Sequence, residues 1–543
     1  MAVQHRIRRW LPFCRSLALS ALILTGLACS RPREPTPRRV ILITLDTFRA
    51  DHMGVYGREP SLTPRIDAFS RLGTIYDNAY SPIPITLPAH ASLFYSLPPH
   101  ALGLYNNGQL FDPDPALISL AEIFRRRGFQ TAAFISLGVL GARFQPARGF
   151  QDYWDIPHPR RWYRTAGEVN EAVFPWLERH LDLPFFLWIH YSDPHDPYAP
   201  PNLPSDLRIH HNGEILTEVC VRKRETLEIN LKIQNGANLL RFECLQPFPV
   251  ARRESRISLN DIVFQNPEGL EISFPRGTLL QRGKHRILAF RESGEVLIRN
   301  PGPERGLTVT AQGNINLFPS EQQVGYRQEI RYLDGEFGRL QDKLDALGLL
   351  DQSLIVLAGD HGEGLGEYLG SNQEVHFGHI HYLKSLYVRV PLIVVDPSSA
   401  AVKPRRVTDL VSLLDIAPFL VKRLGRPRPR FFEGKLLPRR SGDRDRLLFE
   451  ETFTPEAVQD RFGVRRDPWH LILTPENREF QLYHMGKDRF ERQNVYPLFQ
   501  QEPEIRELAR ILIRRSQEVL DSKLEVKLDE SSREMLRSLG YIR

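Results

Sequence analysis

A threonine near the start of an apolar segment could act as a nucleophile. Within residues 85–93, Thr86 stands two residues before Pro88, a pattern typical of a helix N-terminus whose first turn is capped by the threonine hydroxyl. The unpaired N–H groups and the positive dipole of such a helix end favour a tetrahedral oxyanion beside the hydroxyl. Most capping threonines have no further role, so the catalytic interpretation depends on the rest of the chain.

Groups suited to a divalent metal ion follow two apolar runs elsewhere in the sequence. Asp46 follows the first run directly, and Asp360 and His361 follow the other, just before Gly362. Carboxylates with an imidazole suit Zn²⁺, Mn²⁺ or Mg²⁺ better than Ca²⁺. A threonine hydroxyl is a weak nucleophile until a cation holds it as an alkoxide, so Thr86 should be a ligand as well. The predicted metal ligands are Asp46, Thr86, Asp360 and His361.

Two further histidines are candidates for direct contact with the substrate. His195 and His379 could hold the non-bridging oxygens of an ester or protonate its leaving group, because histidine carries a proton near neutral pH. With Asp193 they could instead form a second metal site. We favour a single metal, because a carboxylate such as Asp193 more commonly orients a histidine or binds beside the substrate.

Short apolar runs that alternate with helical patterns predict an α/β core. Such runs are typical of buried parallel strands, and ligands of such sheets bind at the carboxyl ends of the strands. The predicted strands are residues 40–45, 131–135, 185–189, 354–358 and 392–395, and the clearest helices are 63–73, 326–347 and 503–520.

Between Asp206 and Pro319 the helical periodicity disappears, and short alternating segments separated by turn signals take its place. This pattern predicts an inserted β-sandwich domain, whose simplest role is structural and whose alternative role is binding of a substrate or partner. A proline- and arginine-rich run at 426–430 marks a second junction, to a smaller C-terminal α/β portion. The predicted units are a leader and linker at 1–38, catalytic segments at 39–205 and 321–425, the inserted domain at 206–320 and a C-terminal subdomain at 426–543.

The chain begins with features of a bacterial export signal. Three arginines among residues 6–9 precede an apolar run at 17–27, and Cys29 follows at a position typical of lipoprotein attachment. An uncleaved N-terminal membrane anchor is the alternative. We therefore expect an extracytoplasmic, periplasmic or cell-envelope protein tethered to the membrane, in which Cys220 and Cys244 could form a disulfide. The net charge of +7 over 543 residues is dispersed, which argues against a nucleic-acid partner.

Several motifs resemble those of the sulfatase family of the alkaline phosphatase superfamily. They are LITLDTFRADH at 42–52, TLPAHAS at 86–92, DPHDPY at 193–198, GDHGEG at 359–364, and GH at 378–379 followed by RVPL at 389–392. The resemblance spans nearly the whole chain outside the leader and the inserted region. It implies an alkaline-phosphatase-like sheet sandwiched by helices, a divalent metal and an anionic ester substrate, linked to a glycan or lipid.

The departures from the family pattern concern the reacting groups. Thr86 stands where classical sulfatases carry the Cys or Ser that becomes formylglycine, so no formylglycine is expected. His90 replaces an arginine of that motif, which implies contact with the substrate group, and Thr47 replaces the second aspartate of the usual pair. His361 and His379 replace an asparagine and a sulfate-binding lysine. These changes are similar to relatives that cleave or transfer phosphoryl groups with an unmodified Thr or Ser.

The sequence thus predicts an exported metallohydrolase that cleaves phosphate or sulfate esters through Thr86. Two alternatives remain: a membrane-associated phosphoryl-group transferase resembling phosphoethanolamine transferases, and a catalytically silent binding protein. The two motifs that contain Thr86 and Asp360 argue against the silent protein.

Overall fold

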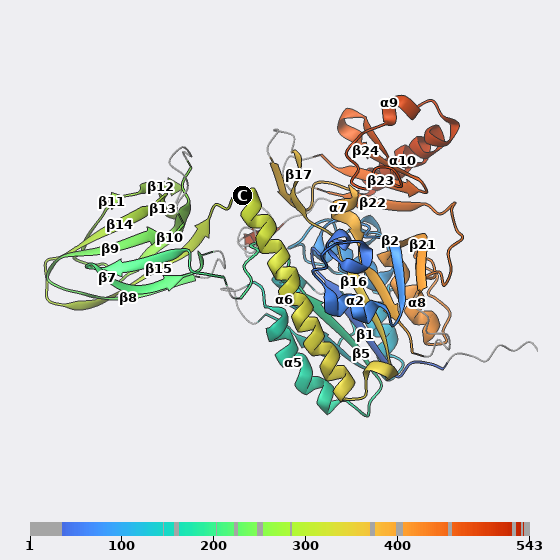
Figure 1. Ribbon diagram of the computed structural model, residues 1–543, viewed down its shortest axis with the longest axis horizontal. Coiled ribbons are helices and arrows are strands. Elements are labelled where there is room, and N and C mark those ends of the chain that lie inside the picture. Colours follow the sequence, from blue (N-terminus) through green and yellow to red (C-terminus); the bar gives the residue numbers. More distant parts are fainter. Residues whose placement is uncertain are drawn as a thin grey trace, which may run out of the picture.

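A mixed nine-stranded sheet forms the centre of the molecule in the computed structural model (Figure 1). The model describes residues 35–536 except 145, 157–161, 202, 222–225, 247–253, 283–284, 370–374, 398–404, 454–458, 524–527, 531 and 534–535. The strand order is β19-β2-β20-β16-β1-β5-β3-β4, with β21 paired to β2. The strands are β1 (Arg39–Leu45), β2 (Thr74–Tyr80), β3 (Gln130–Phe134), β4 (Asp152–Trp154), β5 (Phe185–Tyr191), β16 (Ser353–Gly359), β19 (Arg389–Val390), β20 (Leu392–Val395) and β21 (Arg405–Ser412).

All five predicted strands are present, but one runs in the opposite direction. β1 pairs in parallel with β16 on one side and with β5 on the other. β20 is antiparallel to both β16 and β2, so the prediction of a parallel strand at 392–395 was wrong. A short run of Val, Ile and Leu indicates burial on both faces but carries no information about direction.

Helices cover both faces of this sheet. Alternate residues of β1 point to opposite sides, so Val40 and Leu42 pack with one group of helices and Ile41 and Ile43 with another. The first group is α3 (Thr86–Tyr95), α4 (Leu120–Arg125) and α8 (Ile416–Arg423). The second is α2 (Pro64–Ser70), α5 (Ala166–Arg179) and α6 (Pro319–Ala346), which lie together in Figure 1. The α/β core sandwiched by helices is therefore confirmed.

The long helix α6 begins seven residues before the predicted start at 326. Pro319 occupies its first turn, where a missing N–H costs nothing, and the Glu321 carboxylate accepts a hydrogen bond from the Phe318 N–H. Apolar residues then face the sheet at helical spacing, among them Ile330, Leu333 and Phe337. The other predicted helices are present as α2 and α10 (Pro503–Ser522).

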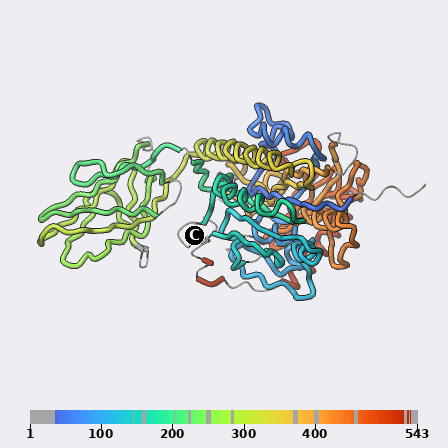
Figure 2. The backbone as a smooth tube through the Cα atoms, turned by 90° about the horizontal axis from the view of Figure 1, so that it is seen from below, coloured from blue at the N-terminus to red at the C-terminus, as the bar shows by residue number. Residues whose placement is uncertain are grey.

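The inserted segment forms two five-stranded antiparallel sheets that enclose an apolar core of their own. One sheet contains β8 (Thr226–Ile233), β10 (Ile257–Gln265), β12 (Thr278–Arg282), β13 (His285–Phe290) and β15 (Arg305–Ile315). The other contains β6 (Leu207–His211), β7 (Glu214–Val219), β9 (Gly236–Cys244), β11 (Glu271–Arg276) and β14 (Ser293–Asn300). The sandwich projects from one side of the core, as Figure 2 shows from a second direction. Cys220 and Cys244 are not joined by a disulfide.

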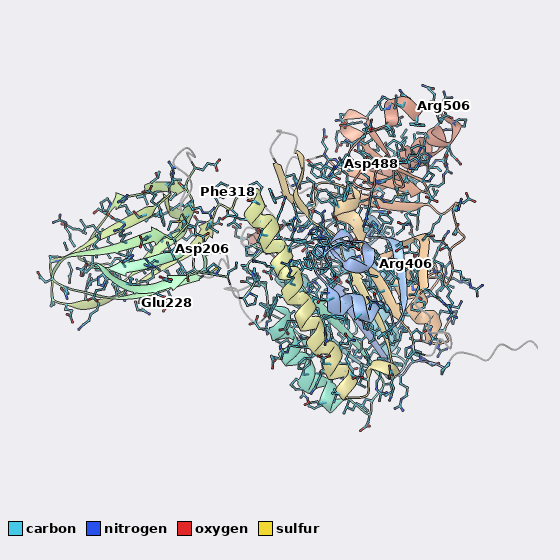
Figure 3. The ribbon with its side chains drawn as sticks, viewed as in Figure 1. Asp206, Glu228, Phe318, Arg406, Asp488 and Arg506 are labelled. Atoms are coloured by element: carbon cyan, nitrogen blue, oxygen red, sulfur yellow. The ribbon has the colours of Figure 1, made fainter. Side chains whose placement is uncertain are left out.

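Both ends of the sandwich lie at its junction with the core, where Figure 3 labels Asp206 and Phe318. The side chain of Arg256, 1% exposed, crosses this junction. It donates to Glu321 Oε1 and Oε2 on α6 at 2.8 and 3.0 Å. The inserted domain is thus anchored to the same helix that covers the central sheet.

The C-terminal portion is a four-stranded antiparallel sheet with α10 packed against it. Its strands are β22 (Leu448–Thr452), β23 (Arg461–Arg466), β24 (Trp469–Thr474) and β25 (Glu479–His484). The remaining elements are a hairpin of β17 (Gly364–Leu369) and β18 (Val375–Gly378), and the short helices α7 (Ser385–Val388) and α9 (Tyr496–Phe499). Within the described residues, no helix has the length and apolarity that crossing a membrane would require. The predicted leader, including Cys29, lies outside them.

Candidate catalytic site

Thr86 begins helix α3 but does not cap it. Ile85 occupies the cap position, Thr86 is the first helical residue, and the cap residue itself makes no side-chain hydrogen bond to the helix. The prediction of a capping hydroxyl was therefore wrong. The N–H of Leu87 is instead satisfied by the side-chain oxygen of Asn107 at 2.8 Å. Thr86 Oγ1 lies 3.1 Å from Nε2 of His361, so the hydroxyl faces the ionisable groups at the end of the sheet.

The predicted carboxylates meet there because their strands are neighbours. Leu45 at the end of β1 pairs with Gly359 at the end of β16, so Asp46 and Asp360 leave the sheet side by side. The Asp360 N–H donates to the Leu45 carbonyl at 3.2 Å. His361 Nε2 lies 3.5 Å from Asp360 Oδ2 and 3.9 Å from Asp46 Oδ1. Both acids and His361 are at most 1% exposed.

The oxygen atoms of these acids fit a metal ion better than they fit the protein around them. Both oxygens of Asp46 and Oδ2 of Asp360 are buried, and none has a hydrogen-bond partner in the described part of the chain. Such groups are costly unless a proton or cation compensates them. Asp46, Asp360 and His361 can each place a ligand atom within 4.8 Å of the others. Four tetrahedral ligands at metal bonds of 2.0–2.2 Å stand roughly 3.3–3.6 Å apart, close to the separations observed.

Burial and mutual charge shift the pKa values of this group strongly. Burial, followed by the Asp46 carboxylate, raises the pKa of Asp360 well above its ordinary range. Burial would raise the pKa of Asp46 too, but His190, His195 and His361 together lower it to about 2. Burial lowers the pKa of His361 to about 4, which keeps its imidazole neutral and able to bind a metal ion.

His90 is held inside the protein by both ring nitrogens. Nδ1 lies 2.8 Å from the Thr86 carbonyl, which can only accept, so this nitrogen carries the proton. Trp188 Nε1 donates to Thr44 Oγ1, whose own proton then points to His90 Nε2 at 3.0 Å. The ring is fully buried and burial lowers its pKa to about 3. This neutral ring connects the first turn of α3 with strand β1 of the sheet beneath it. The sequence had suggested that His90 contacts the substrate.

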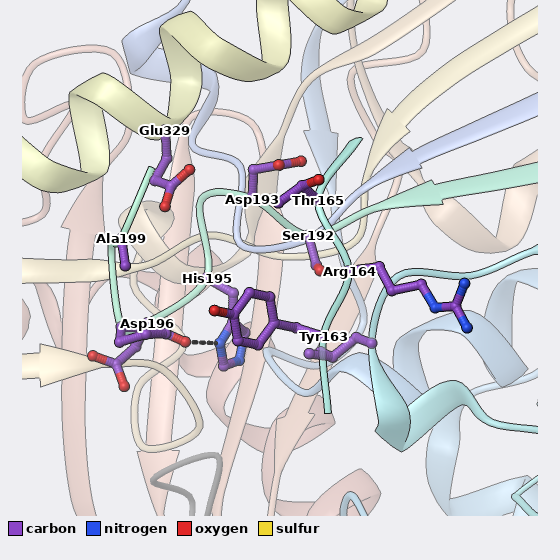
Figure 4. A pocket seen from close by; sticks show the side chains of 11 residues that line it. Tyr163, Arg164, Thr165, Ser192, Asp193, His195, Asp196, Ala199 and Glu329 are labelled. Atoms are coloured by element: carbon purple, nitrogen blue, oxygen red, sulfur yellow. Dashed lines mark hydrogen bonds between the residues drawn. The ribbon is translucent and has the colours of Figure 1, made fainter. Parts of the chain in front are cut away.

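A line of imidazoles extends from the metal-type ligands toward the loop after β5. The rings of His361 and His379 have centroids 4.4 Å apart, and those of His379 and His195 are 5.5 Å apart. His195 Nδ1 donates to the Asp196 carbonyl at 2.7 Å, a bond drawn in Figure 4. His379 Nδ1 lies 3.4 Å from the buried carboxylate of Glu363. Glu363 belongs to the same motif as Asp360 and His361 but was not among the predicted site residues.

Asp193 lies in the same loop but turns toward helix α5. Its Oδ1 accepts the N–H of Ala166 at 2.9 Å, in the first turn of that helix. Burial raises its pKa to about 7. It lines a small cavity with Thr165, His195 and Glu329, shown in Figure 4. Within the described residues Asp193 belongs to neither group close enough to hold a metal ion.

His190 is a second residue near the acids that was not among the predicted site residues. It stands near the end of β5, opposite Thr44 of β1, and is fully buried. Its Nε2 lies 3.4 Å from Asp46 Oδ2, and with His90 and Asp360 it forms the second group of metal-type ligands. The available signal was its position directly after an apolar run, the same position that singled out Asp46.

Comparisons with known proteins agree on one family. The Sulfatase family model matches residues 38–425. The chain is 22% identical over 534 residues to an N-acetylglucosamine-6-O-sulfatase of Bacteroides thetaiotaomicron, covering 91% of this chain and 89% of that protein. It is 24% identical over 446 residues to an ulvan-active sulfatase of Formosa agariphila, covering 82% and 72%.

Two solved structures share the fold. One is the phosphonate monoester hydrolase of Agrobacterium radiobacter, with a TM-score of 0.56 and 16% identity over 90% of this chain and 96% of that one. The other is a protein in complex with its substrate D-glucosamine-2-N,6-O-disulfate, with a TM-score of 0.58 and 17% identity over 90% and 100%.

Proposed function

This chain belongs to the sulfatase family and is a hydrolase acting on sulfate or phosphate esters, and we propose that it cleaves them through Thr86 as an unmodified nucleophile. The observation that carries the proposal is the position of the Thr86 hydroxyl, 3.1 Å from His361 Nε2 and beside a pair of buried carboxylates. The helix cap needs no hydroxyl here, so Thr86 is available for chemistry.

Four residues would hold the divalent metal ion: Asp46, Thr86, Asp360 and His361. Their donor set suits Zn²⁺, Mn²⁺ or Mg²⁺, and the unpartnered carboxylate oxygens support the assignment. When bound, such an ion lowers the pKa of a coordinated hydroxyl and neutralises charge on the ester oxygens. The chain orients the hydroxyl: α3 begins at Thr86, and His90 fixes the Thr86 carbonyl.

His195 and His379 are positioned to bind the anionic group and move a proton. His195 is oriented by the Asp196 carbonyl and His379 by Glu363. Burial lowers the pKa of His379 well below its ordinary value, so this ring is neutral near pH 7 when no anion lies against it. An ester anion placed against it would favour the protonated ring, which can then donate to the leaving oxygen.

We extend the proposal to substrate and location. The relatives named above are an N-acetylglucosamine-6-O-sulfatase, an ulvan-active sulfatase and a phosphonate monoester hydrolase, so the panel should contain glycan sulfates, aryl sulfates, phosphate esters and phosphonates. The arginines and apolar run of the leader support an envelope location with a lipid at Cys29. A transferase or a silent binding protein has less support, because the named relatives are hydrolases.

Turnover of the panel by Thr86 variants tests the nucleophile. Thr86→Ala should lower kcat by roughly 10³-fold or more, whereas Thr86→Ser, which keeps a hydroxyl, should stay within about tenfold. Thr131→Ala is the matched control: this buried threonine donates to the Gly149 carbonyl, and its loss should leave turnover per folded molecule unchanged. Thr86→Cys should not gain sulfatase activity with formylglycine-forming enzymes, because His90 replaces the motif's arginine. Near-normal turnover by Thr86→Ala would overturn the covalent mechanism.

A further inference from the structure

We infer that the protein has a second anion-binding site, separate from the catalytic residues, which takes a phosphate or sulfate ester of sugar size. The site is a cavity of about 520 Å³ lined by the turn 54–57, β2, α7, β19, β21 and the loop after β25. Pockets for small molecules typically have volumes of about 300–1,000 Å³. None of the proposed catalytic or metal-binding residues is among the described residues that line it. The site therefore does not depend on the proposed Thr86 mechanism.

Three arginines from distant parts of the sequence line this cavity. They are Arg389 of β19, Arg406 of β21 and Arg489 after β25. Figure 3 labels Arg406, on the side of the molecule away from the inserted sandwich. Arg389 begins the RVPL motif, and the catalytic site gives this residue no role. A planar guanidinium matches the oxygens of phosphate and sulfate in pairs, so three of them suit a tetrahedral oxyanion.

Backbone carbonyls hold these guanidinium groups in place. Arg389 Nε and Nη2 donate to the Asp77 carbonyl at 3.0 and 2.7 Å. Arg489 Nη2 donates to the Tyr56 carbonyl at 3.1 Å, and Arg406 Nη1 donates to the carbonyl of the preceding residue at 3.2 Å. A carbonyl orients a guanidinium but does not neutralise it, so the positive charge stays available to a ligand.

The acids around the cavity do not balance these charges. Asp77 is the one carboxylate among the described lining residues, and its Oδ1 lies 3.3 Å from Arg406 Nη1. No acid in the described part of the chain forms an ion pair with Arg389 or Arg489. Three arginines and one aspartate leave two positive charges in excess, which suits a phosphate ester with its charge of about −1.5 to −2 at pH 7.

Arg389 and Arg489 lie close enough to repel each other. Burial, followed by the positive charge of Arg389, lowers the pKa of Arg489 from its ordinary value. Asp51 acts in the opposite direction, but it is already paired with Arg49 at 2.8 Å. A lone arginine at the surface needs no partner, because water and salt screen its charge. Several arginines in one cavity are stabilised by an anion that binds among them.

Met485 provides a local readout of binding, because its side chain lines this cavity. The test observes isotope-labelled methionine methyl groups of the full chain by NMR, with the Met485 signal identified from Met485→Leu. This signal should shift to saturation with glucose-6-phosphate or glucose-6-sulfate and should not respond to glucose. The ester that binds more tightly identifies the source of the anion, a phosphorylated or a sulfated sugar. Both esters are checked for hydrolysis after each titration.

Two substitutions should change the affinity in opposite directions. Arg489→Gln should weaken binding of the tighter ester by about tenfold or more, because it removes a charged donor. Asp77→Asn should strengthen binding by about two- to tenfold, because it removes the carboxylate from the cavity. A damaged fold would not produce such a gain. Arg339→Gln is the matched control, because it removes the same charge from α6, where Arg339 pairs with Glu171 and Glu336. It should leave the dissociation constant unchanged.

Three results would overturn the inference. The first is a Met485 signal that responds to neither ester, or that responds to glucose as strongly as to the esters. The second is unchanged affinity in Arg489→Gln. The third is unchanged or weaker binding in Asp77→Asn, which decides the matter alone if Arg489→Gln does not fold. Loss of turnover in the Thr86 variants bears on none of these readouts, so the two proposals fail separately.

Discussion

Two buried clusters in this chain contain a pair of acids and histidines, yet only one of them contains a cation from the protein. In the C-terminal sheet, Arg465 donates to Glu450 at 2.6 Å and to Glu491 at 2.9 Å. His470 bridges the same two acids, at 3.2 and 2.9 Å. At the end of the central sheet, no described lysine or arginine forms an ion pair with Asp46 or Asp360, although they are just as buried.

The difference indicates what each cluster is for. Burying a carboxylate is unfavourable unless a cation and good hydrogen bonds compensate it. In the C-terminal cluster the chain supplies this cation, so the arrangement is complete as folded. In the catalytic cluster the described residues supply acids and imidazoles but no lysine or arginine, so we expect the compensating positive charge to come from outside, as in a metal site.

The largest expected effect follows from removing the internal cation. Arg465→Met keeps much of the side-chain volume but leaves Glu450 and Glu491 with only His470 between them. We expect the free energy of unfolding to fall by about 3–5 kcal/mol, because an uncompensated buried charge remains. Urea denaturation measures the change. A loss below about 1 kcal/mol would show that the cluster does not depend on Arg465.

The next largest effect is the stabilisation of the protein by a metal ion bound at Asp46 and Asp360. Zn²⁺ at 100 times its dissociation constant should stabilise the parent protein by about 2.7 kcal/mol, and a chelator should reverse the gain. Asp360→Asn should lose this dependence while the metal-free protein stays at least as stable, because one of two repelling carboxylates is gone. Glu450→Gln, by contrast, should lose stability with or without Zn²⁺. Thermal unfolding with Zn²⁺ and with chelator distinguishes the two, and equal stabilisation of Asp360→Asn would refute the site.

Acid should destabilise the protein through the C-terminal cluster. Burial would raise the pKa of Glu491, but His470 and Arg465 outweigh it and lower the pKa below its ordinary value of 4.5. A carboxylate whose pKa is lower in the folded than in the unfolded state stabilises the fold. This contribution is complete at pH values above the pKa of the unfolded state, and it is lost as the pH falls through the pKa of the folded state. Urea midpoints of metal-free protein should therefore decline below about pH 4.5. Glu491→Gln should be less stable at pH 7 and should show a flatter decline.

The residues at the strand ends could be found from sequence because their signal is local. Asp46 and Asp360 each follow a continuous apolar run, and such runs end at the rim of a buried sheet. Such apolar runs do not indicate the direction of β20 or the order of the strands in the sheet. His190 reaches Asp46 only because β5 lies next to β1, a pairing set by the packing of the whole sheet.

For Thr86, too, the local sequence does not reveal which distant residues become neighbours in the fold. The local pattern of Thr86 and Pro88 correctly placed a helix start, but the direction of the hydroxyl depends on a partner 275 residues away, His361. A capping interaction and a catalytic one look alike in a short stretch of sequence. They differ only in which distant groups the tertiary fold brings to the hydroxyl.

The smallest effect is expected at a second arginine that also pairs with two glutamates but is exposed to water. Arg339 of α6 donates to Glu171 of α5 at 2.8 Å and to Glu336 at 2.9 Å, with its side chain 48% exposed. Arg339→Met repeats the substitution made at Arg465, yet water and salt already screen these charges. We expect a loss of at most about 1 kcal/mol that disappears in 1 M salt, measured by the same urea denaturation. If Arg339→Met cost as much as Arg465→Met, burial would not be what distinguishes the clusters, and the argument for an external cation at Asp46 and Asp360 would lose its basis.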